Sequence, residues 1–355
     1  MDLQSAQLAE MLKELKSRSK ARIATESGIF TLILSLCLHG NSITLLIMLK
    51  NRRMRVIPAN MFVASLAISD FALAVLSSFS GFAVVLTSRW PYSELTCQFQ
   101  GYLAITLAIA SMQTLALMAL NRYFRIVNPK RYRRYFSKKK TILIICASWL
   151  YSLCAPLPYT ISGMVFHPSK FFCYLQIDSR AFTALMAIVY VGLPTCIIFY
   201  CYPRIFNTVR SHNSNFETSR NGRDTVNVEE IKVVRTLFVI VVFFNICWTP
   251  IFVIDITDIV LGGWIFPREL YVAYSFLATI SSAINPLIYG VLNKSFQKEY
   301  LKILRCNCCE VRTTIQPIMT VEKRTSTVNG SNKRVQMAEN RLFEVKPFTR
   351  KDHTG

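Results

Sequence analysis

Charged residues are scarce in this chain. Asp, Glu, Lys and Arg make up 17% of its 355 residues, whereas they make up about a quarter of a typical soluble domain. Asp70 is the one acidic or basic residue within seven long apolar segments, which are residues 29–49, 59–88, 95–120, 141–166, 181–203, 236–254 and 270–292. Each segment is near or above the roughly 20 residues that span a membrane. A soluble protein is disfavoured, because it would need seven helices much longer than the usual ~11–12 residues.

Because lipid offers no partners to open backbone groups, the seven segments must be helices. They predict an all-α membrane protein, a seven-transmembrane helix bundle with a cytoplasmic amphipathic helix. Phe296, Tyr300 and Leu304 recur at helical spacing between lysines, the pattern of a helix on a membrane surface. The predicted regions are an extracellular tail (1–28), the seven-transmembrane domain (29–292), the amphipathic membrane-surface helix (293–305) and a disordered cytoplasmic tail (306–355).

Acidic residues are also missing from some of the loops. Residues 125–140 contain eight Lys or Arg and no acid, and residues 50–55 contain four. The positive-inside rule places these loops in the cytoplasm, the N-terminus outside and the C-terminus inside. Loops that face anionic lipid explain most of the net charge of +21, and no folded nucleic-acid-binding module accompanies it, so no nucleic-acid partner is expected. We expect no cleavable signal peptide, because residues 1–28 are too charged to contain its apolar core.

Most of the eleven cysteines lie inside the apolar segments, where Cys behaves as a small hydrophobe. Cys97 and Cys173 are the two at the predicted outer boundary. That setting is oxidising, so a disulfide between them is predicted, with two free thiols as the alternative. The cysteines after the seventh segment have no histidine nearby, which argues against zinc and favours palmitoylation. These are Cys306, Cys308 and Cys309.

Short motifs occur in order along the seven segments. Arg122 follows Cys97 by 25 residues, about 37 Å of helix, so these two residues lie at opposite faces of the membrane. The motifs are Gly40-Asn41, Ser65-Leu66-Ala67-Ile68-Ser69-Asp70, Cys97, Asn121-Arg122-Tyr123, Trp149, Pro194 with Tyr202, Phe244 with Cys247-Trp248-Thr249-Pro250, and Asn285-Pro286-Leu287-Ile288-Tyr289. In this order they resemble the rhodopsin-like (class A) G-protein-coupled receptors over about residues 29–305.

This resemblance implies a plasma-membrane receptor rather than an enzyme, without a cofactor. Its implied partners are a small-molecule ligand, a heterotrimeric G protein and arrestin. Arg122 and Glu230 are expected to pair in the inactive state; alternatively each faces water and lipid headgroups. The pair is expected to be weak, because Asn121 replaces the family's usual acid. The implied coupling and switch residues are Asn121, Arg122, Tyr123, Tyr202, Glu230, Asn285, Pro286 and Tyr289. The implied toggle in the bendable helices is formed by Trp248, Phe244 and Pro194.

Asp70 is an ionisable group in mid-membrane, and such groups are costly and usually functional. The resemblance implies that Asp70 holds a sodium ion, which acts as an allosteric effector. The metal ligands would be Asp70 and Ser111 together with Asn245, Ser281 and Asn285, whose oxygens suit a hard cation. The alternative is a neutral, hydrogen-bonded Asp70 with a packing role.

The implied ligand pocket lies in the outer third of the bundle. Its expected lining is Ala104, Ile105, Ala108, Met186, Tyr190, Trp248, Ile251, Phe252, Asp255, Ser275 and Thr279. Ala104 stands where amine-binding members have an acid, which disfavours a monoamine ligand. Thr279 stands where light-sensing members have the retinal-binding lysine, and residues 270–292 contain no lysine, so retinal is excluded. A pocket with few polar groups suits a compact, mostly neutral ligand.

Within the family, the sequence is most similar to melatonin receptors, through Asn121-Arg122-Tyr123 and residues 289–300. Those receptors have a histidine at the position of Tyr190 and an alanine at that of Pro286, so the similarity is partial. Two other functions stay open. A membrane transporter is disfavoured by the lack of an internal repeat and by the single intramembrane acid. A ligand-independent, constitutive receptor-like protein is a third interpretation, which the residues do not exclude.

Overall fold

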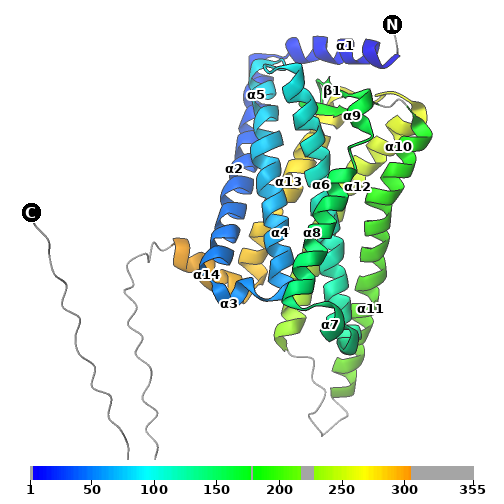
Figure 1. Cartoon of the computed structure of the whole chain (residues 1–355). Coiled ribbons are helices and arrows are strands. Elements are labelled where there is room, and N and C mark those ends of the chain that lie inside the picture. Colours follow the sequence, from blue (N-terminus) through cyan, green and yellow to red (C-terminus); the bar gives the residue numbers. More distant parts are fainter. Residues whose placement is uncertain (1–2, 177–178, 217–227, 305–355) are drawn as a thin grey trace, which may run out of the picture. The chain divides into compact units, whose positions relative to one another are not determined.

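The computed structural model describes residues 3–176, 179–216 and 228–304, all within one compact unit, Met1–Cys309 (Figure 1). Most of these residues are helical. The α-helices are α1 (Leu3–Lys16), α2 (Lys20–Lys50), α3 (Arg52–Arg55), α4 (Pro58–Leu73), α5 (Phe79–Thr87), α6 (Glu94–Val127), α7 (Pro129–Tyr135), α8 (Lys138–Cys154), α9 (Tyr159–Ser162), α10 (Arg180–Ala187), α11 (Leu193–Phe216), α12 (Val228–Leu261), α13 (Arg268–Leu292) and α14 (Lys294–Leu304). Two π-helical turns, η1 (Ala74–Ser78) and η2 (Ile188–Gly192), and two strands, β1 (Met164–His167) and β2 (Phe172–Leu175), complete the described elements.

Seven helical rods pack side by side, as the apolar segments predict (Figure 1). Five rods are single helices: α2, α6, α8, α12 and α13. The other two, α4–η1–α5 and α10–η2–α11, continue through a π turn, a local widening of the helix. Among the described helices, six rods are long and apolar enough to cross a membrane. The remaining rod, α8, has 17 residues, about 25 Å of helix.

The fourth predicted segment, residues 141–166, is wrong in its second half. α8 ends at Cys154, and the chain then forms α9 and β1. Pro156 and Pro158 end the helix, because proline lacks an N–H and its ring clashes with the preceding turn. β1 pairs antiparallel with β2, with Phe166 opposite Cys173. The predicted all-α fold therefore needs one correction, a two-stranded hairpin. The hairpin lies at the end of the bundle that is predicted to face outward, which is termed the outer end; the opposite end is termed the inner end.

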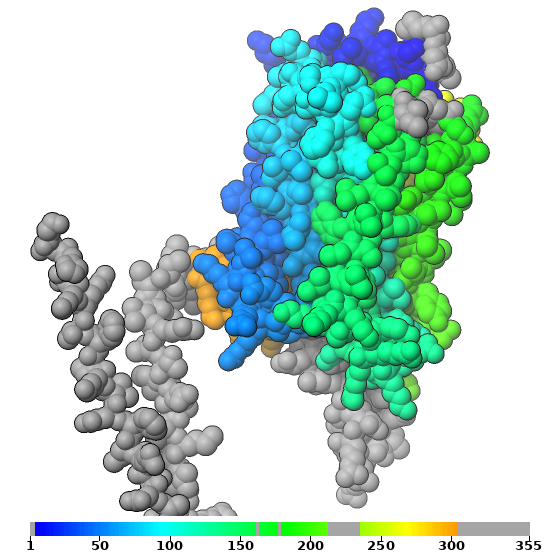
Figure 2. Space-filling model, in the orientation of Figure 1, coloured from blue at the N-terminus to red at the C-terminus, as the bar shows by residue number. Residues whose placement is uncertain are grey.

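The region predicted as an extracellular tail, residues 1–28, is helical over most of its described length. α1 lies across the end of the bundle, as both views of the molecule show (Figures 1 and 2). Its Met11 and Leu15 are buried against the bundle. α2 begins at Lys20 rather than at residue 29, because Ser19 caps it by accepting from the Arg22 N–H. A helix can extend beyond the lipid through polar residues. A prediction from apolar content alone therefore places the start of α2 too late in the sequence.

The hairpin and α14 are fixed at opposite ends. The predicted Cys97–Cys173 disulfide is present and ties β2 to the outer end of α6, with Cα atoms 5.4 Å apart. At the other end, α14 runs over residues predicted to form the surface helix. Its Phe296 is fully buried and stacks on Tyr289, with ring centroids 5.3 Å apart. The predicted palmitoylation sites Cys306, Cys308 and Cys309 and the tail 306–355 lie outside the described residues.

Candidate functional site

A cavity of about 200 Å³ lies in the outer half of the bundle, below the hairpin. Ten of the eleven predicted lining residues surround it: Ala104, Ile105, Ala108, Met186, Tyr190, Trp248, Phe252, Asp255, Ser275 and Thr279. Ile251 does not line it. Ile251 lies on the same helix, α12, but is buried in the cluster that contains Trp264 and Tyr271.

The polar end of the cavity contains a lysine that the sequence analysis did not identify. Lys170 lies in the turn between β1 and β2, and its side chain is completely buried. Its Nζ donates to Asp255 Oδ1 at 3.1 Å. The same ammonium lies 3.8 Å from the ring centroid of Tyr174 and 4.2 Å from that of Tyr274. Its nearness in sequence to Cys173 was the available signal, because the predicted disulfide holds this turn close to α6.

The hairpin turn is held in place from several sides. Ser275 Oγ on α13 donates to the Lys170 carbonyl, and the Lys170 N–H donates to His167 Nδ1 at 3.2 Å. His167 is fully buried between the rings of Trp264 and Tyr271. Burial holds the pKa of His167 well below its usual value, and the nearby Lys170 charge lowers it further. The turn therefore forms part of the cavity wall rather than an open loop.

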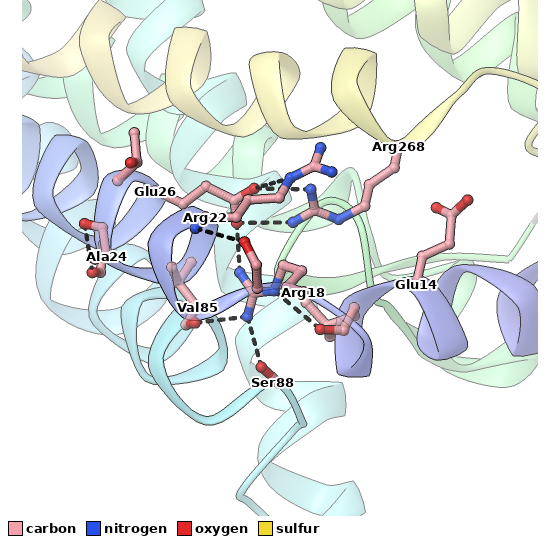
Figure 3. A network of polar contacts seen from close by, with 12 residues as sticks. Glu14, Arg18, Arg22, Ala24, Glu26, Val85, Ser88 and Arg268 are labelled. Atoms are coloured by element: carbon pink, nitrogen blue, oxygen red, sulfur yellow. Dashed lines mark hydrogen bonds and ion pairs between the residues drawn. The ribbon is translucent and has the colours of Figure 1, made fainter.

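A buried ionic cluster, formed by Arg18, Glu26 and Arg268, closes the outer end next to the hairpin (Figure 3). Arg268 donates to both Glu26 oxygens at 2.8 Å. Arg18 donates to Glu26, to the Val85 carbonyl at 2.7 Å and to Ser88 Oγ at 2.9 Å. Burial lowers the pKa of Arg18, and the Glu26 carboxylate opposes this shift. The cluster joins the α1–α2 connection to α2, α5 and α13. It was not predicted, because residues 1–28 were interpreted as a tail.

Asp70 lies in a polar cluster in the middle of the bundle. Ser111 Oγ at 3.0 Å and Ser282 Oγ at 2.9 Å donate to its Oδ1, and Asn285 Nδ2 donates to its Oδ2 at 2.8 Å. Two other predicted members are directed elsewhere. Ser281 donates to the Ala278 carbonyl, and Asn245 donates to the Val241 carbonyl. Ser282 takes the place predicted for Ser281, because one residue turns a helix by about 100°.

The oxygen atoms at this cluster fit a small hard cation. Asp70 supplies a buried carboxylate, and Ser111 and Ser282 supply hydroxyls next to it. Asn285 Oδ1 is buried and has no hydrogen-bond partner among the described residues. Oxygen donors of this kind are the preferred ligands of hard cations.

The predicted coupling residues gather at the inner end. Arg122 and Asn121 are buried there on α6, and Tyr123 contacts Tyr200, with ring centroids 5.8 Å apart. Tyr202 and Tyr289 lie in the same inner core. Glu230 belongs to α12, but its side chain lies outside the described part of the structure, so the predicted Arg122–Glu230 pair stays a prediction.

The predicted toggle residues and helix prolines lie along the middle of the bundle. Phe244 stacks on Trp248 with ring centroids 5.4 Å apart. Pro194 follows η2, and Pro286 lies inside α13. Pro286 packs so closely on Gly40 that a Cβ at position 40 would lie 2.8 Å from the proline Cβ. This contact explains why a glycine accompanies the proline.

A bundle of seven helical rods with an outer cavity, a mid-membrane acid and an inner arginine defines a seven-helix membrane receptor. Residues 40–289 match the family described as 7 transmembrane receptor (rhodopsin family), and the chain belongs to this family. It is therefore a multi-pass membrane protein and a G-protein-coupled receptor, not an enzyme or a transporter.

The similar proteins include several melatonin receptors. Melatonin receptor type 1A of Gallus gallus is 30% identical over 79% of this chain and 79% of its own length. Melatonin receptor type 1C of the same species is 28% identical, over 75% of this chain and 77% of its own. Melatonin receptor type 1B of Homo sapiens is 28% identical, over 75% and 74%. These similarities agree with the subgroup resemblance that the motifs indicate.

Proposed function

We propose that this receptor binds a small, neutral ligand in its outer cavity and in response promotes nucleotide exchange on a heterotrimeric G protein. This proposal rests on the charges and hydrogen-bonding groups that line the cavity. Asp255 is already paired with Lys170, so the pair presents little net charge. Trp248 lines the same cavity, and its buried Nε1 has no hydrogen-bond partner among the described residues. A neutral ligand with one acceptor and one donor satisfies both groups without burying an unpaired charge.

Neutral indole amides are the first ligand class to test, because the similar proteins are named as melatonin receptors. Tyr190 lines the cavity where those receptors have a histidine, so the polar contact at this point differs. We therefore propose a ligand of melatonin-like size and neutrality, with melatonin itself as one member of the panel.

The test is nucleotide exchange by purified receptor and G protein, measured with neutral indole amides and with the corresponding amines. Ala108→Phe fills the cavity and should abolish the response to an active ligand. Ala147→Phe is the matched control, because Ala147 lies on the exposed face of α8. Equal responses from both variants would place ligand binding elsewhere.

Arg122 is proposed to be the coupling residue. It lies at the inner end of α6 near Tyr202, and a planar guanidinium can both pair with an acid and stack on an aromatic ring. In the same assay, Arg122→Ala should lose exchange while keeping ligand affinity and surface level. Exchange at the wild-type rate would contradict this role. A pairing of Arg122 with Glu230 in the inactive state remains part of the proposal.

Sodium and arrestin complete the proposal. The oxygen atoms around Asp70 suit a sodium ion that stabilises one helix packing over another. Arrestin recruitment is proposed to depend on phosphorylated Ser and Thr in residues 313–331, where each phosphate adds about −1.5 to −2 charges.

The basic elements α3, α7 and α14 share the end of the bundle opposite α1 (Figure 1). The positive-inside rule therefore supports an extracellular N-terminus and a cytoplasmic C-terminus at the plasma membrane.

A further inference from the structure

The surroundings of the Lys170 ammonium are those of a binding site for an organic amine. The rings of Tyr174 and Tyr274 lie within 4.2 Å of Nζ, and that of Tyr271 lies at 5.5 Å. Asp255 accepts a hydrogen bond from the ammonium at 3.1 Å. Aromatic faces combined with a carboxylate are the arrangement by which proteins recognise alkylammonium ligands. Here the chain's own lysine fills that arrangement.

The acids and tyrosines of this arrangement are linked to one another. Tyr274 donates to Asp255 Oδ2 at 3.0 Å, and Tyr271 donates to Asp258 Oδ1 at 2.8 Å. Asp258 also lines the cavity and is almost fully buried. The rings of Tyr271 and Tyr274 and both carboxylates are therefore held in position by α12 and α13, independently of Lys170. Tyr174 lies on β2 and accepts a hydrogen bond from Tyr274 at 3.4 Å.

We propose that Asp255, Asp258, Tyr174 and Tyr274 form a cation subsite of the ligand cavity, which Lys170 occupies as an internal ligand. The receptor rejects protonated amines because this subsite is filled, and it accepts neutral ligands in the apolar remainder of the cavity. The proposal rests on the proposed function, since it takes this cavity to be the ligand site. It adds a specificity-determining residue, Lys170, which the sequence analysis did not identify.

The hairpin cannot easily withdraw the lysine. The disulfide fixes Cys173 three residues further on, and Ser275 holds the Lys170 carbonyl. Next to Lys170, the ring of Phe171 lies under two guanidinium groups, at 5.8 Å from that of Arg18 and 5.7 Å from that of Arg268. These are the arginines of the buried ionic cluster (Figure 3). The ammonium is therefore a fixed part of the cavity, and an external amine has to compete with a tethered one.

The test compares tryptamine, which carries an ammonium, with N-acetyltryptamine, its neutral amide. Binding is measured from the melting temperature of purified full-length receptor at increasing probe concentration. Wild-type receptor should show little stabilisation by tryptamine. Lys170→Met empties the subsite and should bind tryptamine at least tenfold more tightly than wild type. Lys170→Met combined with Asp255→Asn should lose this gain, because the carboxylate is gone.

Two controls define the outcome. Lys139→Met removes an exposed lysine at the start of α8, away from the cavity, and should leave tryptamine affinity unchanged. Lys170→Arg keeps the charge and should still exclude tryptamine. A folded Lys170→Met receptor with wild-type tryptamine affinity overturns the proposal, and so does tight tryptamine binding by wild type.

A second measurement covers poor folding of Lys170→Met, which leaves two acids without a cation. Expression is repeated with n-butylammonium in the medium, and with n-butanol as the neutral control. Recovery of folded receptor with the amine alone is expected, and recovery with neither or with both overturns the proposal. Binding is read without G protein, so failure of the cation subsite is separate from failure of nucleotide exchange, which would overturn the proposed function instead.

Discussion

At the residue scale, the outer end of the molecule buries charges that its membrane segments avoid. Glu26 accepts from two buried arginines, Arg18 and Arg268, and from the more exposed Arg22, so one carboxylate faces three guanidinium groups (Figure 3). A buried charge is tolerated only when it is paired and hydrogen-bonded. The cluster therefore depends on Glu26 more than on either arginine.

We expect Glu26→Gln to lower the melting temperature of the receptor strongly. Removing one partner of a buried ion pair typically costs about 3–5 kcal/mol, because the remaining charge stays buried. Thermal unfolding in detergent measures the effect. Glu14→Gln is the matched control, since Glu14 is exposed on α1 and should shift the melting temperature little. Equal shifts in the two variants would mean that the cluster does not stabilise the outer end.

Lowering the pH should destabilise the outer end of the receptor through His167. Its pKa lies well below the usual ~6.5 in the folded receptor, owing to burial and then to Lys170. Below pH ~6.5 the unfolded chain takes up a proton that the folded receptor does not, so stability falls as the pH falls. The melting temperature should therefore decrease from pH 7.5 to 5.5. His167→Asn should flatten this decrease, and an unchanged decrease in that variant would contradict the role of His167.

At the scale of elements, the hairpin and α6 form a unit that depends on a glycine. A Cβ at Gly101 would lie 2.9 Å from the Cys173 carbonyl and 2.9 Å from Met164 Cγ. The backbone of β2 and the start of β1 can lie against α6 only because this side chain is absent. The disulfide from Cys97 then fixes the strand one helical turn away.

Gly101→Ala should therefore displace the hairpin and weaken ligand binding. Overpacking of this kind typically costs about 1–3 kcal/mol. The matched control is Gly28→Ala on α2, where an added Cβ meets no atom within 4 Å. That substitution should be neutral or slightly stabilising, since an exposed helix gains from alanine. Ligand affinity and melting temperature are measured for both, and unchanged values for Gly101→Ala would contradict the contact.

The helical rods were predictable because each depends on a local property, the length of an uncharged run. Their ends were less predictable. The start of α2 depends on the Ser19 cap and on the partners of Glu26, and the end of α8 depends on two prolines. The boundaries were predicted from apolar content alone. That criterion misses helical turns with polar residues that are buried by other elements.

At the scale of the whole molecule, sodium should link the middle of the bundle to the two ends. If the ion binds at Asp70, raising sodium concentration should lower basal nucleotide exchange and agonist affinity, because the ion favours one packing of the helices. Asp70→Asn should abolish this dependence. Ser282→Ala should weaken it and Ser281→Ala should not, since Ser282 donates to Asp70 whereas Ser281 donates to the Ala278 carbonyl. A sodium response that persists in Asp70→Asn would exclude the site.

The sequence by itself determined the class of this protein. The linear sequence contains long apolar segments, basic loops and an ordered set of motifs. These features predicted the helices, the disulfide and ten of the eleven cavity residues. The helices depend on helical periodicity and on membrane thickness, which act on each segment separately, whereas the cavity residues were implied by the resemblance to class A receptors.

Only the tertiary structure decided which residues far apart in the chain share a site. It brings Lys170 from the hairpin turn to Asp255 and Glu26 from α2 to Arg268, and it selects Ser282 over Ser281. A lysine between two strands and a glutamate near the N-terminus resemble ordinary solvated charges when read alone. Their roles follow from burial, because a charge removed from water needs a partner that only the packing of distant elements supplies.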